Sequence, residues 1–215
     1  MTTFPNSPRL LKAGLVLLDP DTGQVQGTIS MQYNPESLTR SLQIQSAGME
    51  SGQRSEPLRL KGPAIEMIKL EAEIDATDQL ANPDQNPDVV LYGIQPQLAA
   101  LETLVNPSSQ QLLENNAQIM GGTLEIAPME APLALFVWGS SRMVPVRVTE
   151  FSITEEAFDQ TLNPIRAKVT LGLRVLTIDD FALGDFGAGL FLSSLQTTER
   201  LAVKAMSGML STMGL

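Results

Sequence analysis

The chain has 215 residues, of which 43% are hydrophobic and 18% are charged, and its formal net charge is -10. This balance is typical of a globular protein with a buried core, and the negative charge argues against nucleic acid or an anionic membrane as the main partner. The sequence contains no His and no Cys. Their absence excludes Ser-His-Asp triads, Cys nucleophiles, disulfides and metal sites built from thiolate or imidazole, so we expect neither a cofactor nor a metal.

The N-terminal region does not resemble a secretory signal. Its apolar run at residues 13–18 is short and is closed by Asp19-Pro20, with no small-residue cleavage site behind it. No window of the sequence reaches the roughly 18 uninterrupted apolar residues that a membrane-spanning helix needs. We therefore expect synthesis in the cytoplasm without a signal peptide, and no direct membrane insertion.

Short strands are predicted in the first part of the chain. We expect strands at residues 15–18, 26–33 and 38–45, with a tight turn at 19–23 between the first two. The apolar residues that share one face of the third strand are Leu38, Leu42 and Ile44.

Residues 46–63 form a polar, Gly-containing stretch that is too long for a plain hairpin, so we expect an extended loop. The next segment, residues 65–75, alternates between apolar and charged residues, which predicts a strand with one buried face. The residues assigned to the buried face are Ile68, Leu70, Ala72 and Ile74. Those on the opposite face are Lys69, Glu71, Glu73 and Asp75, which we interpret as a solvated sheet face.

One central helix is predicted at residues 93–105, after a turn-rich stretch at 78–88. Its apolar residues recur at helical spacing, and Asn106-Pro107 ends it. A shorter helical segment is expected at residues 109–115.

The most regular pattern in the chain is a long antiparallel hairpin at residues 144–177, preceded by an apolar strand at 133–138 and a turn at 139–141. Apolar and polar residues alternate in its second strand, as in a sheet with one face in a core. The apolar face is Ala167, Val169, Leu171, Leu173 and Val175, and the other face is Arg166, Lys168, Thr170 and Arg174.

These elements predict a mainly β fold, an antiparallel β-barrel or sandwich with one central helix, over residues 1–177. Residues 178–215 are expected to be a Gly-rich linker followed by a C-terminal helical tail. The residues at helical spacing along one stripe of this tail are Ala202, Ala205, Met206, Met209, Leu210 and Met213.

Three ordered segments resemble the tube-domain proteins of contractile injection systems, the phage-tail-like particles of bacteria. The first is GLVLLDPDTGQVQGTISMQYNPESLTRSLQIQ, the second GPAIEMIKLEAEIDA, and the third VPVRVTEFSITEEAFDQTLNPIRAKVTLGLRVL. The resemblance covers about residues 14–176.

This resemblance implies a tail-tube-like fold, a hexameric ring, and a place at the baseplate between the spike and the inner tube. The implied partners are further copies of the chain, the spike or hub protein, the inner tube protein and baseplate subunits. Many members carry a C-terminal LysM module. Residues 178–215 are too short for that module and lack its pattern, which leaves docking through LysM and peptidoglycan binding without support.

The candidate subunit contacts are Tyr33, Asn34, Pro35, Arg166, Lys168 and Arg174. Around Tyr33 the alternative is a strand terminator, since Pro35 removes a donor and restricts Asn34; the two interpretations are compatible. For the basic residues the alternative is pairing within the chain with Glu71 and Glu73. These two acids and Asp75 could also line the lumen of a ring as a uniformly negative surface.

The tail and one acidic cluster also admit two interpretations each. Glu155, Glu156 and Asp159 could serve acid–base chemistry or bind a divalent cation, although solvated charges at the tip of the hairpin explain them more simply. We prefer docking of the tail on a neighbouring baseplate or tube subunit to self-packing. The candidate docking residues are Leu195, Met206, Met209, Leu210 and Met213.

The sequence therefore predicts a non-enzymatic structural subunit: a hexameric ring at the baseplate that joins the spike to the inner tube and templates tube assembly. The alternative within the same class is the bulk inner tube protein. A remote alternative from another class is a carboxylate-dependent hydrolase of the particle. The particle itself could be cytoplasmic, membrane-docked or extracellular.

Overall fold

The fold is built on seven strands, which form one antiparallel sheet in the order β2-β1-β5-β6-β7-β4-β3. The computed structural model describes residues 12–20, 22–32, 34–46, 59–120, 131–182 and 184–212, with side chains up to Met206. The strands are β1 Gly14–Leu18, β2 Val25–Ser30, β3 Leu38–Gln43, β4 Ile65–Asp75, β5 Leu133–Val137, β6 Met143–Phe158 and β7 Pro164–Val175. The mainly β, antiparallel prediction is therefore confirmed.

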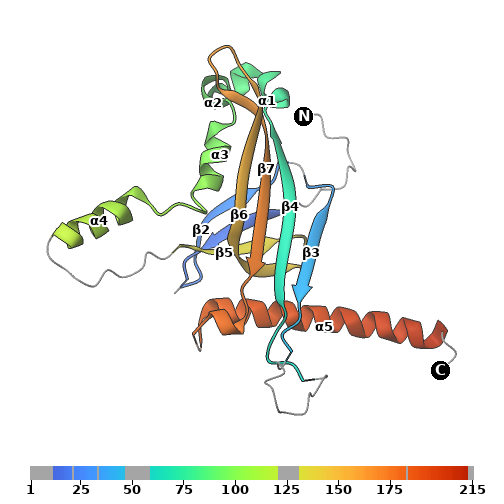
Figure 1. Cartoon of the computed structure of the whole chain (residues 1–215). Helices are drawn as coiled ribbons and strands as arrows, with labels where there is room; N and C mark the ends of the chain where they lie inside the picture. The colour runs from blue at the N-terminus through green and yellow to red at the C-terminus, as the bar shows by residue number, and fades with distance from the viewer. Residues whose placement is uncertain are drawn as a thin grey trace.

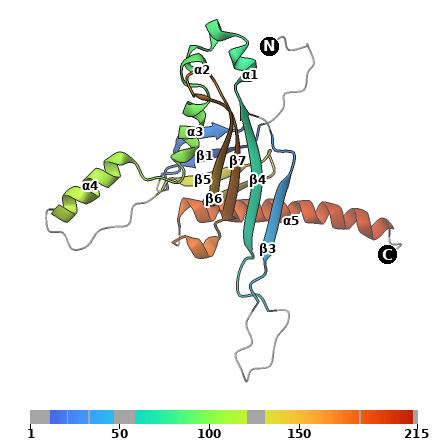
Figure 2. The same ribbon diagram turned by 45° about the horizontal axis from the view of Figure 1, so that its top comes forward.

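The sheet bends, and β6 connects its two parts. The first residues of this 16-residue strand pair with β5, and from Val146 onward it pairs with β7 as far as Phe158. The β6–β7 register shifts between Val148 and Glu150 and again between Glu155 and Phe158. Figures 1 and 2 both show β1, β2 and β5 passing behind β6, β7 and β4. The two parts of the sheet can thus enclose apolar side chains between them.

The core lies between these two parts and is closed on one side by α3. The predicted apolar face of β7 is confirmed, since each of its five residues is at most 2% exposed. Leu15 of β1 and Phe136 of β5 join the same cluster from the other part of the sheet. The buried residues that α2 and α3 add are Val89, Ile94, Leu98 and Leu101.

The described residues form five α-helices, so the prediction of one central helix and a tail was too simple. They are α1 Thr77–Leu80, α2 Pro87–Tyr92, α3 Gln95–Glu102, α4 Ser109–Met120 and α5 Phe186–Thr212, with short 3-10 turns at Pro83–Gln85 and Ile178–Asp180. The predicted helix at 93–105 corresponds to α3. It starts two residues later because Gly93, at φ +60° and ψ −132°, separates it from α2. The helix expected at 109–115 is present and longer.

The sheet is not closed into a barrel in the described part of the chain. β2 pairs there only with β1, and β3 only with β4, so each forms an open edge. The face of β3 that was predicted to be apolar is covered only at Leu38, which packs against the core, whereas Leu42 is 57% and Ile44 71% exposed. A strand at an open edge has a neighbour on one side only, which leaves these side chains in solvent.

The Gly-rich linker predicted after residue 178 is largely helical. Helix α5 begins at Phe186 and includes Gly187 and Gly189. A Cβ at Gly187 would lie 2.3 Å from the ring of Phe181, so this glycine lets the ring lie against the helix. Its role is close packing rather than flexibility. No helix within the described ranges is long and apolar enough to span a membrane.

The alternation in β7 gives a direct test of its two faces. Replacing Leu171, which is 1% exposed, by Asp buries a charge in the core, and we expect loss of soluble folded protein, at a cost above about 4 kcal/mol. Thr170 lies on the outer face, opposite Glu71. We expect its replacement by Asp to lower the free energy of unfolding by less than about 1 kcal/mol. Circular dichroism and urea unfolding check both variants; comparable behaviour of the two variants would contradict the assignment of the faces.

Candidate assembly surfaces

The two open edges of the sheet are the first candidate surface. Each edge carries exposed apolar side chains. Val25, at the start of β2, is 65% exposed. At the other edge, Leu42 of β3 and Ile44 just beyond that strand are also exposed. An edge strand also presents unpaired backbone donors and acceptors, which favour pairing with another chain. The edges therefore combine hydrogen-bonding capacity with apolar area.

Asn34, one of the predicted subunit contacts, has a role within the chain. Its Oδ1 atom accepts a hydrogen bond of 2.9 Å from the amide of Ala13, just before β1, and the amide of Met31 donates to the carbonyl of Ala13. These bonds hold the segment after β2 against the start of β1, as a strand terminator would. Pro35 is half-buried in the same segment, and Tyr33 lies outside the described residues.

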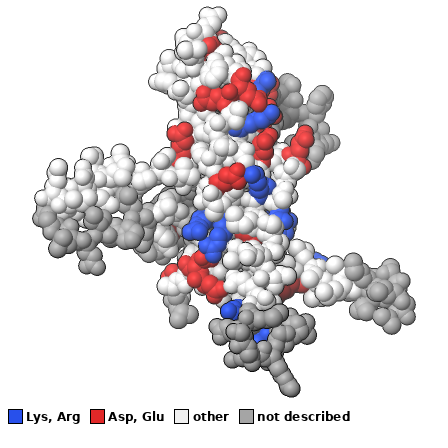
Figure 3. Space-filling view, viewed as in Figure 1, with Lys and Arg blue, Asp and Glu red and all other residues white. Residues whose placement is uncertain are grey.

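The outer face of β4, β7 and β6 carries a ladder of ion pairs. Arg166 pairs with Asp75 at 2.8 Å, Lys168 with Glu156 at 3.0 Å, and Arg174 with Asp180 at 2.8 Å. Lys69 pairs with Glu150 in the same way. The basic residues are thus paired within the chain, but their partners are not the predicted Glu71 and Glu73. Figure 3 shows both signs of charge along this face, which corrects the idea of a uniformly negative surface.

These pairs keep their members ionised but contribute little stability. The pKa of Asp75 is lowered, chiefly by the hydrogen bond from the Thr77 hydroxyl and also by Arg166. The pKa of Lys168 is raised by its hydrogen bond to Glu156 and by the charge of that carboxylate. The side chains of Arg166 and Lys168 are each 44% exposed, so solvent screens the pairs. Their charges remain accessible to a second molecule.

The β6–β7 turn forms a rigid tip at the end of the sheet away from α5. Asp159 organises it: its carboxylate accepts hydrogen bonds from the amides of Thr161 and Asn163, at 2.7 and 2.9 Å. Desolvation raises the pKa of Asp159, but the hydrogen bonds from Thr161 and Asn163 outweigh it and the net pKa is lowered. Asn163 also donates to the carbonyl of Leu91 in α2.

The tip carries an exposed apolar patch that sequence reasoning missed. Leu162 has φ +66° and is 78% exposed. The other exposed apolar residues at the tip and on α2 are Val90, Leu91, Tyr92 and Phe158. Apolar residues beside Asn-Pro in a predicted turn were the only available signal, and their proximity to α2 depends on tertiary contacts.

The carboxylates at the tip do not converge on a site for acid–base chemistry. Glu156 is bound to Lys168, and Asp159 holds the turn with a lowered pKa, the opposite of what a general acid needs. Among the described residues there is also no group of three or more His, Cys, Asp or Glu that could hold a metal ion.

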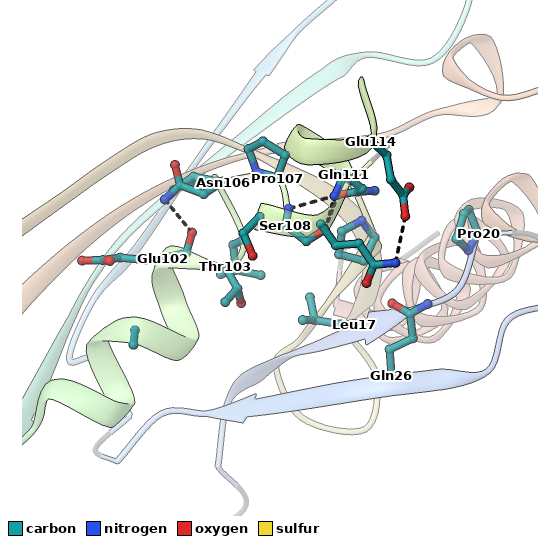
Figure 4. A pocket seen from close by; sticks show the side chains of 17 residues that line it. Leu17, Pro20, Gln26, Glu102, Thr103, Asn106, Pro107, Ser108, Gln111 and Glu114 are labelled. Atoms are coloured by element: carbon teal, nitrogen blue, oxygen red, sulfur yellow. Dashed lines mark hydrogen bonds between the residues drawn. The ribbon is translucent and has the colours of Figure 1, made fainter. Parts of the chain in front are cut away.

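A cavity of about 1070 Å³ forms a wide opening where α3, α4 and the end of β1 meet (Figure 4). Its polar lining is hydrogen-bonded to itself: Asn106 donates to the carbonyl of Glu102, and Gln110 to the carboxylate of Glu114. A second cavity, of about 460 Å³, lies between β2, β4 and α3 and is lined mainly by apolar residues. Neither brings reactive side chains together.

Comparison with known proteins gives one family. The family of contractile injection system tube proteins matches residues 12–180, which include the whole sheet and the first four helices. The chain belongs to this family. No curated protein matches it. The resemblance found in the sequence is thereby confirmed, and the tube family makes this chain a component of a phage-tail-like particle.

Helix α5 of this tube-family protein lies beyond the matched residues. Of the predicted docking residues, Leu195 is 42% and Met206 64% exposed. Met209 and Leu210 belong to α5, but their side chains are outside the described part, and Met213 lies wholly outside it. Leu195 and Met206, the two candidates whose side chains are described, are thus both exposed to solvent.

The tip depends on close contact between Gly93 and β7. A Cβ at Gly93 would lie 2.1 Å from the carbonyl oxygen of Pro164, which accepts a hydrogen bond from the amide of Ile94. We expect Gly93→Ala to cost about 2–4 kcal/mol, measured by urea unfolding. The matched control is Gly139→Ala, also at positive φ but with nothing within 4 Å, which should cost about 1 kcal/mol. Equal losses of unfolding free energy in the two variants would mean that the positive φ, and not the contact with Pro164, determines the effect.

Proposed function

We propose that this tube-family protein forms a closed ring of six copies at the baseplate, where it joins the spike to the inner tube and templates tube assembly. The observation that carries the proposal is the open sheet, whose two edge strands, β2 and β3, each lack a second neighbour in the described structure. The six-fold number and the baseplate position come from the resemblance to tube-domain proteins. The two open edges support the pairing of one copy with the next.

Ring closure satisfies both edges at once. If β3 of one copy pairs with β2 of the next, every edge is paired and growth stops at a closed circle. The same contact covers Val25, Leu42 and Ile44, which are more than half exposed in the single chain. At about 25 cal/mol per Å² of apolar area removed from water, several such side chains per interface contribute a few kcal/mol toward assembly.

The paired basic residues can take part in the same assembly. Arg166, Lys168 and Arg174 keep exposed side-chain area while bound to their own carboxylates. A guanidinium has five N–H donors, so Arg166 and Arg174 can each hold an acid within the chain and contact a second copy. We also propose Tyr33, Asn34 and Pro35 as subunit contacts; Tyr33 lies outside the described residues, and Asn34 and Pro35 follow the edge strand β2 in the chain.

Two features favour an adaptor over the bulk inner tube protein. Helix α5 follows the residues that match the tube family, and it crosses one end of the sheet (Figure 1). A subunit that only stacks on identical rings has no need of an added helix at one end. In a contraction event, such a ring would transmit load between the spike and the tube, a task that requires rigid contacts and no chemistry.

Proline substitution along β3 tests ring closure at the edge. In an antiparallel pair, successive residues point their N–H groups alternately toward the partner strand and away from it. Proline at positions 39, 40, 41 and 42 should therefore fall into two classes. One class breaks a β3–β4 hydrogen bond and destabilises the fold by about 1–3 kcal/mol. The other class removes only an outward donor and should leave a folded monomer that forms no ring.

Circular dichroism and native mass spectrometry of the four variants separate these classes, with the inward-facing prolines as internal controls. Rings that persist in every folded variant would show that β3 is not the contact strand. Long open polymers of the parent chain would favour the bulk tube protein instead.

A further inference from the structure

Helix α5 is longer than the body it crosses. Its 27 residues extend about 40 Å at 1.5 Å per residue. It begins beside the β1–β2 turn, where a Cβ on Gly23 would lie 3.0 Å from the ring of Phe186. Phe191 then packs against the core cluster, and this first part of the helix contacts β6. The first half of α5 is thus anchored under the sheet, starting on the β2 side.

The second half of α5 has no such support. Every residue from Thr198 to Met206 is exposed, although the segment is rich in apolar residues: Leu201 is 49%, Val203 66% and Met206 64% exposed. Figures 1 and 2 both show this half running out beyond β3. The loss of contacts therefore coincides with the edge of the sheet.

A helical segment of this kind gains stability only when its apolar face is covered. Short helices without tertiary contacts are marginal in water, and most helical stability in proteins comes from packing. Methionine is well suited to such contacts because its flexible side chain adapts to a partner surface. The exposed half of α5 is a docking element, and its direction indicates where the partner lies.

That direction points to the adjacent copy of the same chain. The helix starts on the β2 side of the sheet and leaves past β3. If β3 of one copy faces β2 of the next, the free half of α5 reaches the region where the neighbour's own α5 begins. That region of the chain has exposed apolar residues: Val25 is 65% exposed, and Phe186 and Leu192 are 43% and 44% exposed.

The charged residues on and before α5 support the same contact between neighbouring copies. The free half of α5 carries two basic residues, Arg200 and Lys204, against one acidic residue, Glu199. The segment that leads into α5 carries the acids Asp179 and Asp185, and the first ten residues of the helix have no charge. A net positive helix end would thus meet an apolar surface with acids at its border.

We propose that the free half of α5 straps onto the neighbouring copy in the ring, against its β1–β2 turn and the start of its α5. The six helices would then form a continuous belt around one end of the ring. This inference rests on the proposed ring and adds the partner and the surface. The belt would lock each copy to the next in addition to the paired strands.

Paired substitutions test the strap. We expect Val203→Asp with Met206→Asp to leave the monomer folded, because both side chains are exposed, and to raise the concentration at which the ring half-dissociates by at least about tenfold. The matched control is Leu113→Asp on α4, which is equally apolar and 69% exposed, and should leave the ring unchanged. Native mass spectrometry over a dilution series measures the ring.

The possible outcomes distinguish failure of the proposed strap from failure of the proposed ring. Equal ring stability in the strap variant and the parent chain would overturn the strap and leave the ring standing. A parent chain that forms no ring at all would overturn the proposed function itself, and with it the strap.

Cross-linking tests the contact directly, since the natural chain has no Cys. Val25→Cys with Met206→Cys places thiols at opposite ends of the α5 span, because Phe186 beside the turn and Met206 are about 30 Å apart on one helix. A short bis-maleimide therefore cannot join them within one chain. We expect a ladder of linked copies up to six. Leu113→Cys with Met206→Cys is the control, and a ladder no stronger than that control would refute the strap.

Discussion

A β-strand with one neighbour leaves half of its backbone hydrogen-bonding groups without a partner strand, and this constraint governs the molecule. β2 and β3 are such strands at the two ends of a seven-stranded sheet, and both carry apolar side chains in solvent. Soluble proteins usually protect edges with charges, prolines or bulges. Here the β1–β2 pairing has a register shift next to Val25 and β3 carries Arg40, but Val25, Leu42 and Ile44 at or beside the edges are still more than half exposed. These edges are the basis of the proposed pairing of β3 with β2 of a neighbouring copy.

Most of the sheet could be predicted from local patterns. The alternation in β7 assigns its buried face correctly, and β4 has the predicted bounds because its charged and apolar residues alternate without interruption. Whether the sheet closes into a barrel could not be predicted, because closure depends on the distance between β2 and β3. No local sequence pattern encodes that distance. The ion-pair partners were missed for a similar reason. The bulge near Glu155–Ala157 shifts the register, so Lys168 meets Glu156 on β6.

The C-terminal region shows where composition misleads. Three glycines between residues 181 and 191 favour a flexible linker, yet α5 begins at Phe186. Gly187 is needed for contact with Phe181, which a sequence pattern does not reveal. Of the apolar stripe predicted for the tail, Ala202, Ala205 and Met206 have described side chains, and all three are exposed. The exposure of this stripe beyond β3 depends on tertiary structure, and the family match ends at residue 180, before the helix.

The sheet edges and the end of α5 assign two contacts to the same neighbour. Paired strands would set the geometry of the ring, and the strap would hold adjacent copies together under load. The tip, with its apolar patch around Leu162, lies at the opposite end of the sheet and takes part in neither proposed contact.

Native mass spectrometry of the full chain over a range of concentrations tests the central claim most directly. A closed species of six copies, with neither larger nor open-ended products, is the result that the two sheet edges and the tube family together predict. A monomer at every concentration, or polymers without a limiting size, would contradict the claim that these edges close into a ring.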